Sequence, residues 1–245
     1  IVAEQFRIMR NNSQFLTSKG EKPVILITSS MSGEGKSFIA TNFGAVMALT
    51  GKKTVILEFD IRKPKLLQGL QIQSVKGLTN YILGDTRLEE IIHPVKEVDN
   101  LFVIGCGPVP PNPSELLLDP QVDDLFLELK KRFDIIVVDT APAGLVSDSF
   151  TLGRFSNATF FIVRQGHTLK RQLRFVQELY EQQKLPNMGL LVNDIKIKGR
   201  YRGYYGYGNY GYYGYSEGSG SGYFENGNKR SGKKKLWKAV RGFFG

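Results

Sequence analysis

The sequence predicts an α/β protein of three layers, in which a mostly parallel sheet lies between helices and a disordered C-terminal tail follows. Two observations predict the layers: short, near-continuous apolar runs recur along the chain, and longer helix-like segments separate them. Strands that are buried on both faces of a parallel sheet have this character. A third observation, the change to Gly, Tyr, Ser and Asn after about residue 198, predicts the tail.

Six segments are expected to be strands because each is short and almost wholly apolar. In chain order they are residues 24–28, 54–59, 101–104, 135–139, 158–163 and 189–193. Helices are expected between them at 37–50, 120–133 and 169–183. The proline-rich segment 107–113 is too poor in N–H donors for the interior of an element, so we expect a connection there, with Ser114 capping a short helix.

Length and composition favour one sizeable domain followed by a tail. A chain of 245 residues with 41% apolar content can bury one core. Cys106 is the only cysteine, so an intrachain disulfide is excluded, a reducing compartment is favoured and a buried side chain is expected. His93 and His167 stand apart from other ligand residues, so no zinc site is expected.

No apolar run approaches the roughly 20 residues that cross a bilayer, and no signal peptide opens the chain. The sequence as given is therefore expected to be soluble. It begins at Ile1 rather than Met, which indicates a fragment and leaves an upstream membrane segment open.

The formal charge of +10 is concentrated at the C-terminus. From Lys196 onward there are eleven Lys or Arg and two acidic residues, a net charge of +9. A nucleic-acid-binding fold would carry its positive charge on the folded domain, so nucleic acid is not an expected partner. The last residues, 233–244, could form a short basic amphipathic helix, which either contacts anionic lipid headgroups or is a solvated charge run.

Residues 28–37 carry the main chemical motif, a loop that follows an expected strand and opens an expected helix. This is the context of a Walker A loop, whose glycines let backbone N–H groups close on phosphate oxygens. Lys36 would reach the β and γ phosphates of ATP, and Ser37 would bind Mg²⁺. Ser30 replaces the usual first glycine of the motif. The motif predicts a P-loop NTPase fold.

Acidic residues end two further strands. Asp139 follows an apolar strand as in a Walker B motif and would hold Mg²⁺ directly or through water. Glu58 and Asp60 stand two apart, so they project on the same side of an extended chain, and one could bind metal while the other accepts a proton. A single strand-end acid is as often a cap or loop residue, but three together favour a site.

These motifs resemble the bacterial tyrosine kinases (BY-kinases) of the polysaccharide chain-length regulator family over nearly the whole chain. In that family the D-x-D-x-R strand end is called Walker A′; here Glu58, Asp60 and Arg62 match it, with glutamate in place of the first aspartate. The run 107–117 is similar to the family's linker, and Ser32 stands where the family commonly has proline.

The resemblance implies roles for two further regions. Glu4, Arg7 and Arg10 match the family's E-x-x-R-x-x-R segment, which implies an intersubunit contact within a helical oligomerisation segment at residues 1–20; their spacing alone also fits a solvated helix face. Asn193 is similar to the asparagine that contacts adenine in related ATPases, although a strand-end turn explains it nearly as well.

The site expected from the motifs and the resemblance can be stated by role. The catalytic residues are Lys36, Glu58, Asp60, Arg62 and Asp139, with Glu58 or Asp60 as the base; Ser37, Asp60 and Asp139 are the metal ligands; ATP and Mg²⁺ are the cofactors. The cofactor-binding residues are Ser32, Gly33, Glu34, Gly35, Lys36, Ser37, Phe38 and Asn193.

Nine of the eleven tyrosines cluster in the tail and are the expected phosphoacceptors. They are Tyr201, Tyr204, Tyr205, Tyr207, Tyr210, Tyr212, Tyr213, Tyr215 and Tyr223. Glycine spacers would let successive phenols reach a neighbour's site, and each phosphate would add about −1.5 to −2 charges. We therefore expect a kinase domain at 1–198 and a tail at 199–245 that is phosphorylated in trans within a ring, whose protomers separate as the tails become negative. A stacking-prone segment of the kind found in single-strand-binding proteins is the alternative for this tail.

The resemblance also implies partners and a place in the cell: a membrane-spanning activator region upstream or in a partner chain, protein tyrosine substrates, a tyrosine phosphatase, and the cytoplasmic face of the inner membrane, where the activity regulates polysaccharide export. Two other functions share the motifs. One is a deviant-Walker partitioning ATPase, which passes phosphate to water and has no need of clustered tyrosines. The other is a nucleotide-dependent interaction module with little turnover.

Overall fold

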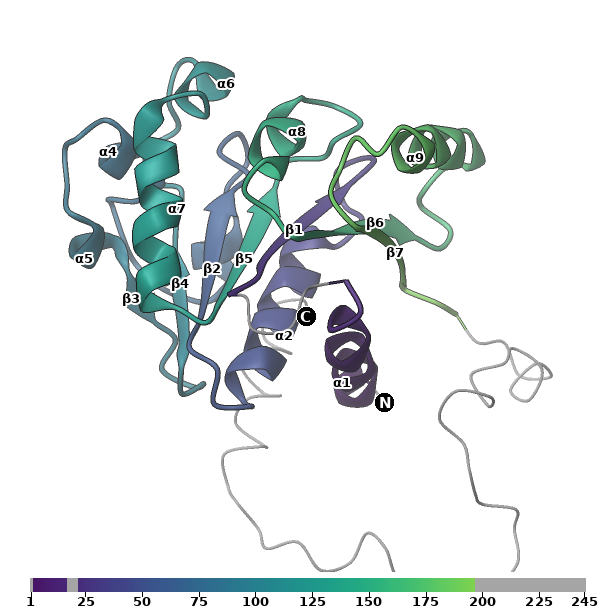
Figure 1. The fold of residues 1–245 in the computed structure, drawn as a ribbon, viewed down its shortest axis with the longest axis horizontal. Helices are drawn as coiled ribbons and strands as arrows, with labels where there is room; N and C mark the ends of the chain where they lie inside the picture. The colour runs from purple at the N-terminus through teal and green to yellow at the C-terminus, as the bar shows by residue number, and fades with distance from the viewer. Residues whose placement is uncertain (1, 17–21, 197–245) are drawn as a thin grey trace, which may run out of the picture.

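The computed structural model describes residues 2–16 and 22–196, which form a seven-stranded sheet with helices on both faces (Figure 1). The strands are β1 Val24–Ser29, β2 Thr54–Phe59, β3 His93–Pro94, β4 Leu101–Ile104, β5 Ile135–Thr140, β6 Ala158–Arg164 and β7 Met188–Asn193. The helices are α1 Val2–Ser13, α2 Lys36–Ala48, α3 Leu66–Gly69, α4 Leu78–Ile82, α5 Leu88–Ile91, α6 Pro113–Leu116, α7 Pro120–Arg132, α8 Asp148–Gly153 and α9 Lys170–Glu181.

The sheet order is β3-β4-β2-β5-β1-β6-β7, and every pairing except β3 with β4 is parallel. The mostly parallel α/β fold expected from the sequence is confirmed, and all six expected strands form with ends within one residue of expectation. The short antiparallel β3 was not expected, because two residues carry no periodic signal.

Two apolar cores lie on opposite faces of the sheet, and the alternation within each strand divides its side chains between them. In β1, Val24 and Leu26 pack with α4, α5, α7, α8 and α9, whereas Ile25 and Ile27 pack with α1 and α2. Strands that are buried on both faces are apolar along most of their length, which explains the near-continuous apolar runs in the sequence.

Helices α7 and α6 show how the sequence determines where a helix begins. Asp119 caps α7 by accepting a hydrogen bond from the N–H of Gln121 at 2.8 Å, and Pro120 follows at the first helical position. In α6 the expected cap is wrong: the helix begins at Pro113 and Asn112 occupies the N-cap, so Ser114 lies inside the first turn. Proline at the first helical position has a preset φ and lacks only an N–H that the helix would not use.

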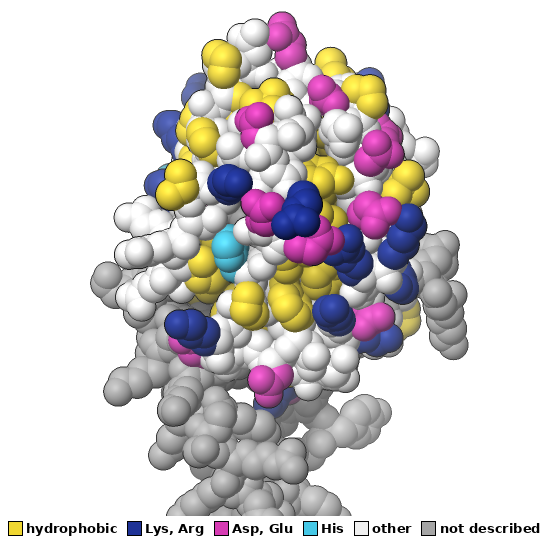
Figure 2. Space-filling model, turned by 90° about the vertical axis from the view of Figure 1, so that its left-hand side faces the viewer, with side chains coloured by type: hydrophobic (Ala, Val, Ile, Leu, Met, Phe, Trp, Pro, Cys, Tyr) yellow, Lys and Arg dark blue, Asp and Glu magenta, His cyan; other side chains and the backbone are white. Residues whose placement is uncertain are grey.

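The face at the β3 edge carries interspersed charges (Figure 2). Ion pairs join Lys76 to Glu90 at 3.1 Å and Lys131 to Glu128 at 2.6 Å. Acidic and basic side chains therefore neighbour one another on this face. Among the described residues, no helix is both long and apolar enough to span a bilayer.

The carboxyl ends of the central parallel strands lie together at one edge of the sheet. Strand β5 lies between β2 and β1, and the register places Asp139 beside both Glu58 and Ile27. The P-loop follows β1 at the same edge. This arrangement brings the motif-bearing segments of the sequence to one place, as expected for ligand sites in open parallel sheets.

Candidate active site at the carboxyl edge of the sheet

The P-loop runs from the end of β1 to the start of α2. Gly33 and Gly35 have φ of 85° and 97°, a region that side chains with a Cβ rarely adopt. A Cβ on Gly35 would also lie 2.3 Å from Asn193 Nδ2. Lys36, the first residue of α2, is buried, and Ser37 is half-buried. The loop therefore has the geometry that the motif predicts.

The side chain of Glu34 is fully buried and holds the loop together from within. Its carboxylate accepts hydrogen bonds from Ser30 Oγ at 2.9 Å and the N–H of Met31 at 2.8 Å, and also from Thr168 Oγ1. Serine in place of the usual first glycine at position 30 thus supplies a donor to the buried carboxylate. The sequence placed Glu34 among the nucleotide-binding residues, and the structure leaves only its backbone for that role.

Phe38, expected to contact the nucleotide, packs its ring edge to face against Phe6 of α1, with centroids 5.8 Å apart. Helix α1 buries Phe6 and Met9 against the sheet and turns Glu4 and Arg7 toward solvent, where they form an ion pair of 2.8 Å. The exposed charges of the expected intersubunit segment are therefore held on a helix that packs next to the P-loop helix.

Asp139 is the most strongly perturbed acid of the site. Its carboxylate is buried, and neither oxygen has a hydrogen-bond partner of ordinary geometry within the described part of the chain. Burial raises the pKa of Asp139 to about 7, even though the Ser37 hydroxyl and Lys36 lie close enough to lower it. A buried carboxylate without partners beside a hydroxyl and an ammonium fits one ligand of a hydrated Mg²⁺.

The two acids at the end of β2 have different surroundings. Glu58 is buried, and its oxygens accept from the backbone N–H groups of Lys65 at 2.5 Å, Cys106 at 3.2 Å and Leu66. Burial raises its pKa, while these three donors lower it. Glu58 therefore anchors the start of α3 and the segment after β4.

Asp60 is only half-buried and accepts one backbone hydrogen bond, from Lys63 at 3.2 Å. Burial raises the pKa of Asp60, and the charge of Lys36 is the main influence that lowers it. Of the two acids that the sequence left open as the base, Asp60 has the more accessible carboxylate and the closer link to the P-loop lysine.

Arg62 connects three segments that are distant in sequence. Its guanidinium contacts Asp148 Oδ2 at 3.1 Å and Ser114 Oγ at 2.8 Å, and Ser114 Oγ contacts Asp148 Oδ1 at 3.3 Å. The Asp148 side chain is fully buried, so the ion pair joins the loop after β2 to α6 and α8. From the sequence, Ser114 was expected only as a helix cap, and Asp148, shortly after the Walker B strand, was considered for a switch-like loop but not assigned to the site.

Asn193 lies at the end of β7 on the outer side of the P-loop. Its Nδ2 donates to the carbonyl of Glu34 at 2.9 Å, and its Oδ1 accepts from the N–H of Asp194 at 2.9 Å. An amide NH₂ has two hydrogens, so one donor remains for another partner such as a base. Two residues of the β6–α9 loop, His167 and Thr168, also contact the P-loop. They were not expected from the sequence, because no motif marks them.

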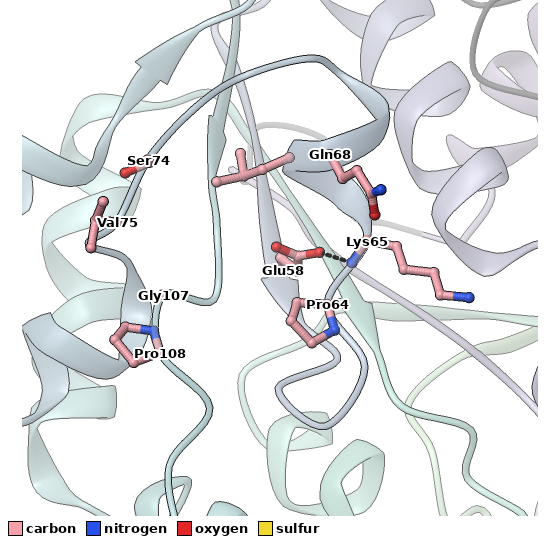
Figure 3. Close-up of a pocket in the computed structure, with 9 residues that line it drawn as sticks. Glu58, Pro64, Lys65, Gln68, Ser74, Val75, Gly107 and Pro108 are labelled. Atoms are coloured by element: carbon pink, nitrogen blue, oxygen red, sulfur yellow. Dashed lines mark hydrogen bonds between the residues drawn. The ribbon is translucent and has the colours of Figure 1, made fainter.

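A pocket of about 330 Å³ opens beside Glu58 (Figure 3). Figure 3 shows Glu58 between the segment 64–68 on one side and residues 74–75 and 107–108 on the other. Its walls combine apolar side chains, such as Leu67 and Val75, with Lys65 and Gln68. No group of three or more His, Cys, Asp and Glu side chains in the described segments could hold a metal without other ligands.

The nine tail tyrosines and the basic segment 233–244 lie outside the described residues. Their expected roles rest on the sequence alone.

Comparisons with known proteins agree with the motifs. The CobQ/CobB/MinD/ParA nucleotide-binding domain family matches residues 25–204. The chain is 32% identical to the tyrosine-protein kinase YwqD of Bacillus subtilis, covering 83% of this chain and 86% of that protein. It is also 32% identical to the tyrosine-protein kinase CpsD of Streptococcus agalactiae, with 84% and 88% covered. By contrast, it spans only 28% of the longer tyrosine-protein kinase wzc of Salmonella typhi.

Solved structures give the same grouping. The kinase domain of the Escherichia coli tyrosine kinase ETK matches with a TM-score of 0.75 and 26% identity, over 81% of this chain and 77% of that one. The septum site-determining protein MinD of Pyrococcus horikoshii matches with a TM-score of 0.56 and 20% identity, over 69% of each chain. The likeness to MinD shows a shared fold, and the match to the ETK kinase domain covers a larger share of this chain.

Proposed function

The chain belongs to the bacterial tyrosine-protein kinases with a CobQ/CobB/MinD/ParA nucleotide-binding domain, and on that premise we propose that it phosphorylates tyrosines in its own tail in trans. The kinase domain spans residues 1–198 and the tail 199–245 in this proposal. ATP is the phosphoryl donor, and the nine clustered tyrosines are the acceptors.

One observation carries the proposal: the buried carboxylate of Asp139 has no hydrogen-bond partner among the described residues and lies next to Ser37 and Lys36. Burying a carboxylate without partners is costly unless a ligand compensates it. Asp139 and Ser37 therefore fit Mg²⁺, with Asp60 as a further ligand. When bound, Mg²⁺ neutralises charge on the phosphate oxygens during transfer.

The remaining residues orient the donor. Gly33 and Gly35 present backbone N–H groups to the phosphates, and Lys36 stabilises the charge that develops on the transferring oxygens. Arg62 stays near Asp60 because Asp148 holds its guanidinium. Asn193 can offer its second amide hydrogen to the base of the nucleotide.

The acceptor needs a base, because a phenol has a pKa near 10. We assign this role to Asp60, since three backbone N–H groups already occupy the oxygens of Glu58. Asp60 does not line the pocket beside Glu58, so we place the acceptor hydroxyl beside Asp60, near Lys36, rather than in that pocket. A carboxylate within hydrogen-bond reach of the phenol would take its proton as transfer proceeds.

In this proposal, charged residues of α1 drive assembly, and the charge of the tail regulates it. We propose that Glu4 and Arg7, which are exposed, and Arg10, which is half-buried, join protomers in a ring, which brings each tail to a neighbouring site. The C-terminal segment from Lys196 onward, with a net charge of +9, would become negative after several phosphorylations, and the protomers would then separate. A tyrosine phosphatase would reset the cycle.

We infer the cellular setting from membership of the family alone. We place the kinase at the cytoplasmic face of the bacterial inner membrane, beside a membrane-spanning activator region upstream or in a partner chain. There it would phosphorylate protein tyrosines and regulate the synthesis and export of a surface polysaccharide.

The test is mass spectrometry of phosphotyrosine after incubation with MgATP, on wild type and Lys36→Met. Wild type should gain several phosphates in the tail, and Lys36→Met should gain none. Simultaneous measurement of released phosphate identifies the alternatives. ATP hydrolysis without phosphotyrosine would indicate a partitioning-type ATPase, and binding without turnover would indicate an interaction module.

A further inference from the structure

Side chains outside the P-loop hold three consecutive carbonyl groups of the loop, those of residues 32–34. In chain order these carbonyls contact His167 Nε2 at 3.0 Å, Arg164 Nη1 at 2.9 Å and Asn193 Nδ2 at 2.9 Å. All three side chains come from the ends of β6 and β7 or the β6–α9 loop. The outer side of the P-loop is therefore attached to the β7 side of the sheet.

These contacts fix the direction of the opposite side of the loop. The C=O and N–H groups of one planar peptide unit point in opposite directions. Holding the carbonyls of residues 32–34 outward therefore turns the N–H groups of residues 33–35 inward. Within the described part of the chain, none of these three N–H groups donates to another residue.

Thr168 connects the same β6–α9 loop to the interior of the P-loop. Its Oγ1 accepts a hydrogen bond from the N–H of Arg164 at 2.8 Å, so its own hydrogen is available to the buried carboxylate of Glu34. The guanidinium of Arg164 is held in turn by Asp194 Oδ2, at 3.1 Å from both Nε and Nη2. The guanidinium that holds the Gly33 carbonyl is thus itself held in place by Asp194.

We propose that Arg164, Thr168 and Asn193 are positioning residues that hold the P-loop in its phosphate-binding conformation before nucleotide arrives. The inference rests on the proposed nucleotide site, adds Arg164 and Thr168, which no motif marks, and gives Asn193 a second role. Prearranged donors bind phosphate without the cost of ordering the loop. Arg164 and Thr168 should therefore strengthen binding of the β-phosphate and leave the base and ribose contacts unchanged, whereas Asn193 would affect both.

The test compares ADP with AMP on Thr168→Val and Thr168→Ser, by calorimetry for ADP and ligand-observed NMR for AMP. Valine has nearly the shape of threonine but cannot donate to Glu34, and a lost hydrogen bond to a charged group is worth about 10-fold in affinity. We expect Thr168→Val to bind ADP about 10-fold more weakly and AMP as wild type does, and Thr168→Ser to restore ADP binding. The KM for ATP should rise by a similar factor with little change in kcat.

Thr159→Val is the matched control. Thr159 lies on β6, is fully buried, and its Oγ1 has no hydrogen-bond partner among the described residues, so this substitution should leave ADP binding unchanged. Equal ADP affinity in Thr168→Val and wild type would overturn the inference, as would an equal loss for ADP and AMP.

A second variant covers the case in which Thr168→Val does not fold. Arg164→Met removes the donor to the Gly33 carbonyl from a half-buried position and should also weaken ADP binding more than AMP binding. Wild type that binds neither ADP nor ATP would refute the proposed function and this inference together. Wild type that binds ADP but transfers nothing to tyrosine would refute only the kinase proposal.

Discussion

At the scale of single residues, the site depends on how each carboxylate is satisfied. Glu58 and Asp139 are both buried, but Glu58 accepts from three backbone N–H groups, whereas Asp139 has no such partner among the described residues. Asp60 is half-buried beside Lys36. A carboxylate at the carboxyl edge of the sheet thus anchors the fold in one case and remains available for chemistry in the others.

Asp139→Asn should stabilise the metal-free protein in a pH-dependent way. The folded-state pKa of Asp139 is raised to about 7 from 3.8, so wild type is relatively most stable below pH 3.8 and loses that contribution as the pH rises to about 7. At pH 8 the variant should be more stable by up to about 4 kcal/mol, and near pH 4 the difference should vanish. Urea unfolding in EDTA measures the free energy of unfolding of both proteins at the two pH values.

Added Mg²⁺ and ATP should reverse that order, because only wild type has the carboxylate ligand. A stability gain that does not depend on pH between 4 and 8 would contradict the burial argument.

Asp60→Asn and Glu58→Gln should separate chemistry from stability. Asp60→Asn should lower tyrosine transfer by about 10²-fold or more, the usual contribution of a catalytic base, with little loss of stability. Glu58→Gln should cost about 1–3 kcal/mol of stability, since it leaves a backbone donor without an acceptor. Initial rates of phosphotyrosine formation and urea unfolding check the pair. A large rate loss in a fully folded Glu58→Gln, with Asp60→Asn active, would assign the base to Glu58.

At the scale of elements, Arg62 ties the loop after β2 to the first turns of α6 and α8. The bonds span 52 and 86 residues of chain, and the Asp148 side chain has no exposed surface. These short helices have few residues with which to bury apolar area, so the ion pair is a main element of their attachment. The stabilisation that this ion pair provides is limited, because the Arg62 side chain is 35% exposed and solvent screens its charge.

A double-mutant cycle on this pair should show strong coupling. Arg62→Met leaves a buried carboxylate whose remaining partner is Ser114, and should cost about 2–3 kcal/mol. Asp148→Asn should cost less, and the double variant should be more stable than the sum of the two losses predicts. Urea unfolding of the four proteins gives the coupling energy, with Ser114→Ala as the milder control. Additive losses would show that the pair contributes no more than its separate packing.

At the scale of the whole molecule, α1 projects its charges outward while its apolar side packs next to α2. The Glu4 and Arg7 side chains are 61% and 49% exposed, so neither is needed to cover the core. Exposed ion pairs of this kind contribute little to the stability of a monomer. Substitution of these residues can therefore test their role in assembly without unfolding the monomer.

Replacing Glu4, Arg7 and Arg10 together by alanine should leave the unfolding free energy within about 1 kcal/mol of wild type and abolish self-association. The rate of phosphorylation in trans should fall when self-association is lost, because tails would no longer be held near neighbouring sites. Analytical ultracentrifugation and phosphotyrosine formation at several protein concentrations measure the two effects. Lys131→Ala on α7 disrupts another exposed (i, i+3) pair and should change neither quantity. Unchanged association in the triple variant would remove α1 from the assembly.

The sequence by itself determined the parallel α/β fold, the six long strands and the place of the P-loop, because periodicity and motif spacing are local properties of the chain. The four-residue helices α3 and α5 and the strand β3 could not be predicted from it, since so few residues carry no periodic signal, whereas a short helix at Ser114 was expected. Only the tertiary structure decided which strand-end acid is satisfied by backbone and which remains available. It also revealed the pairs Arg62 with Asp148 and Thr168 with Glu34, which are 86 and 134 residues apart. Such pairs depend on which side chains meet after folding, and no local pattern encodes that.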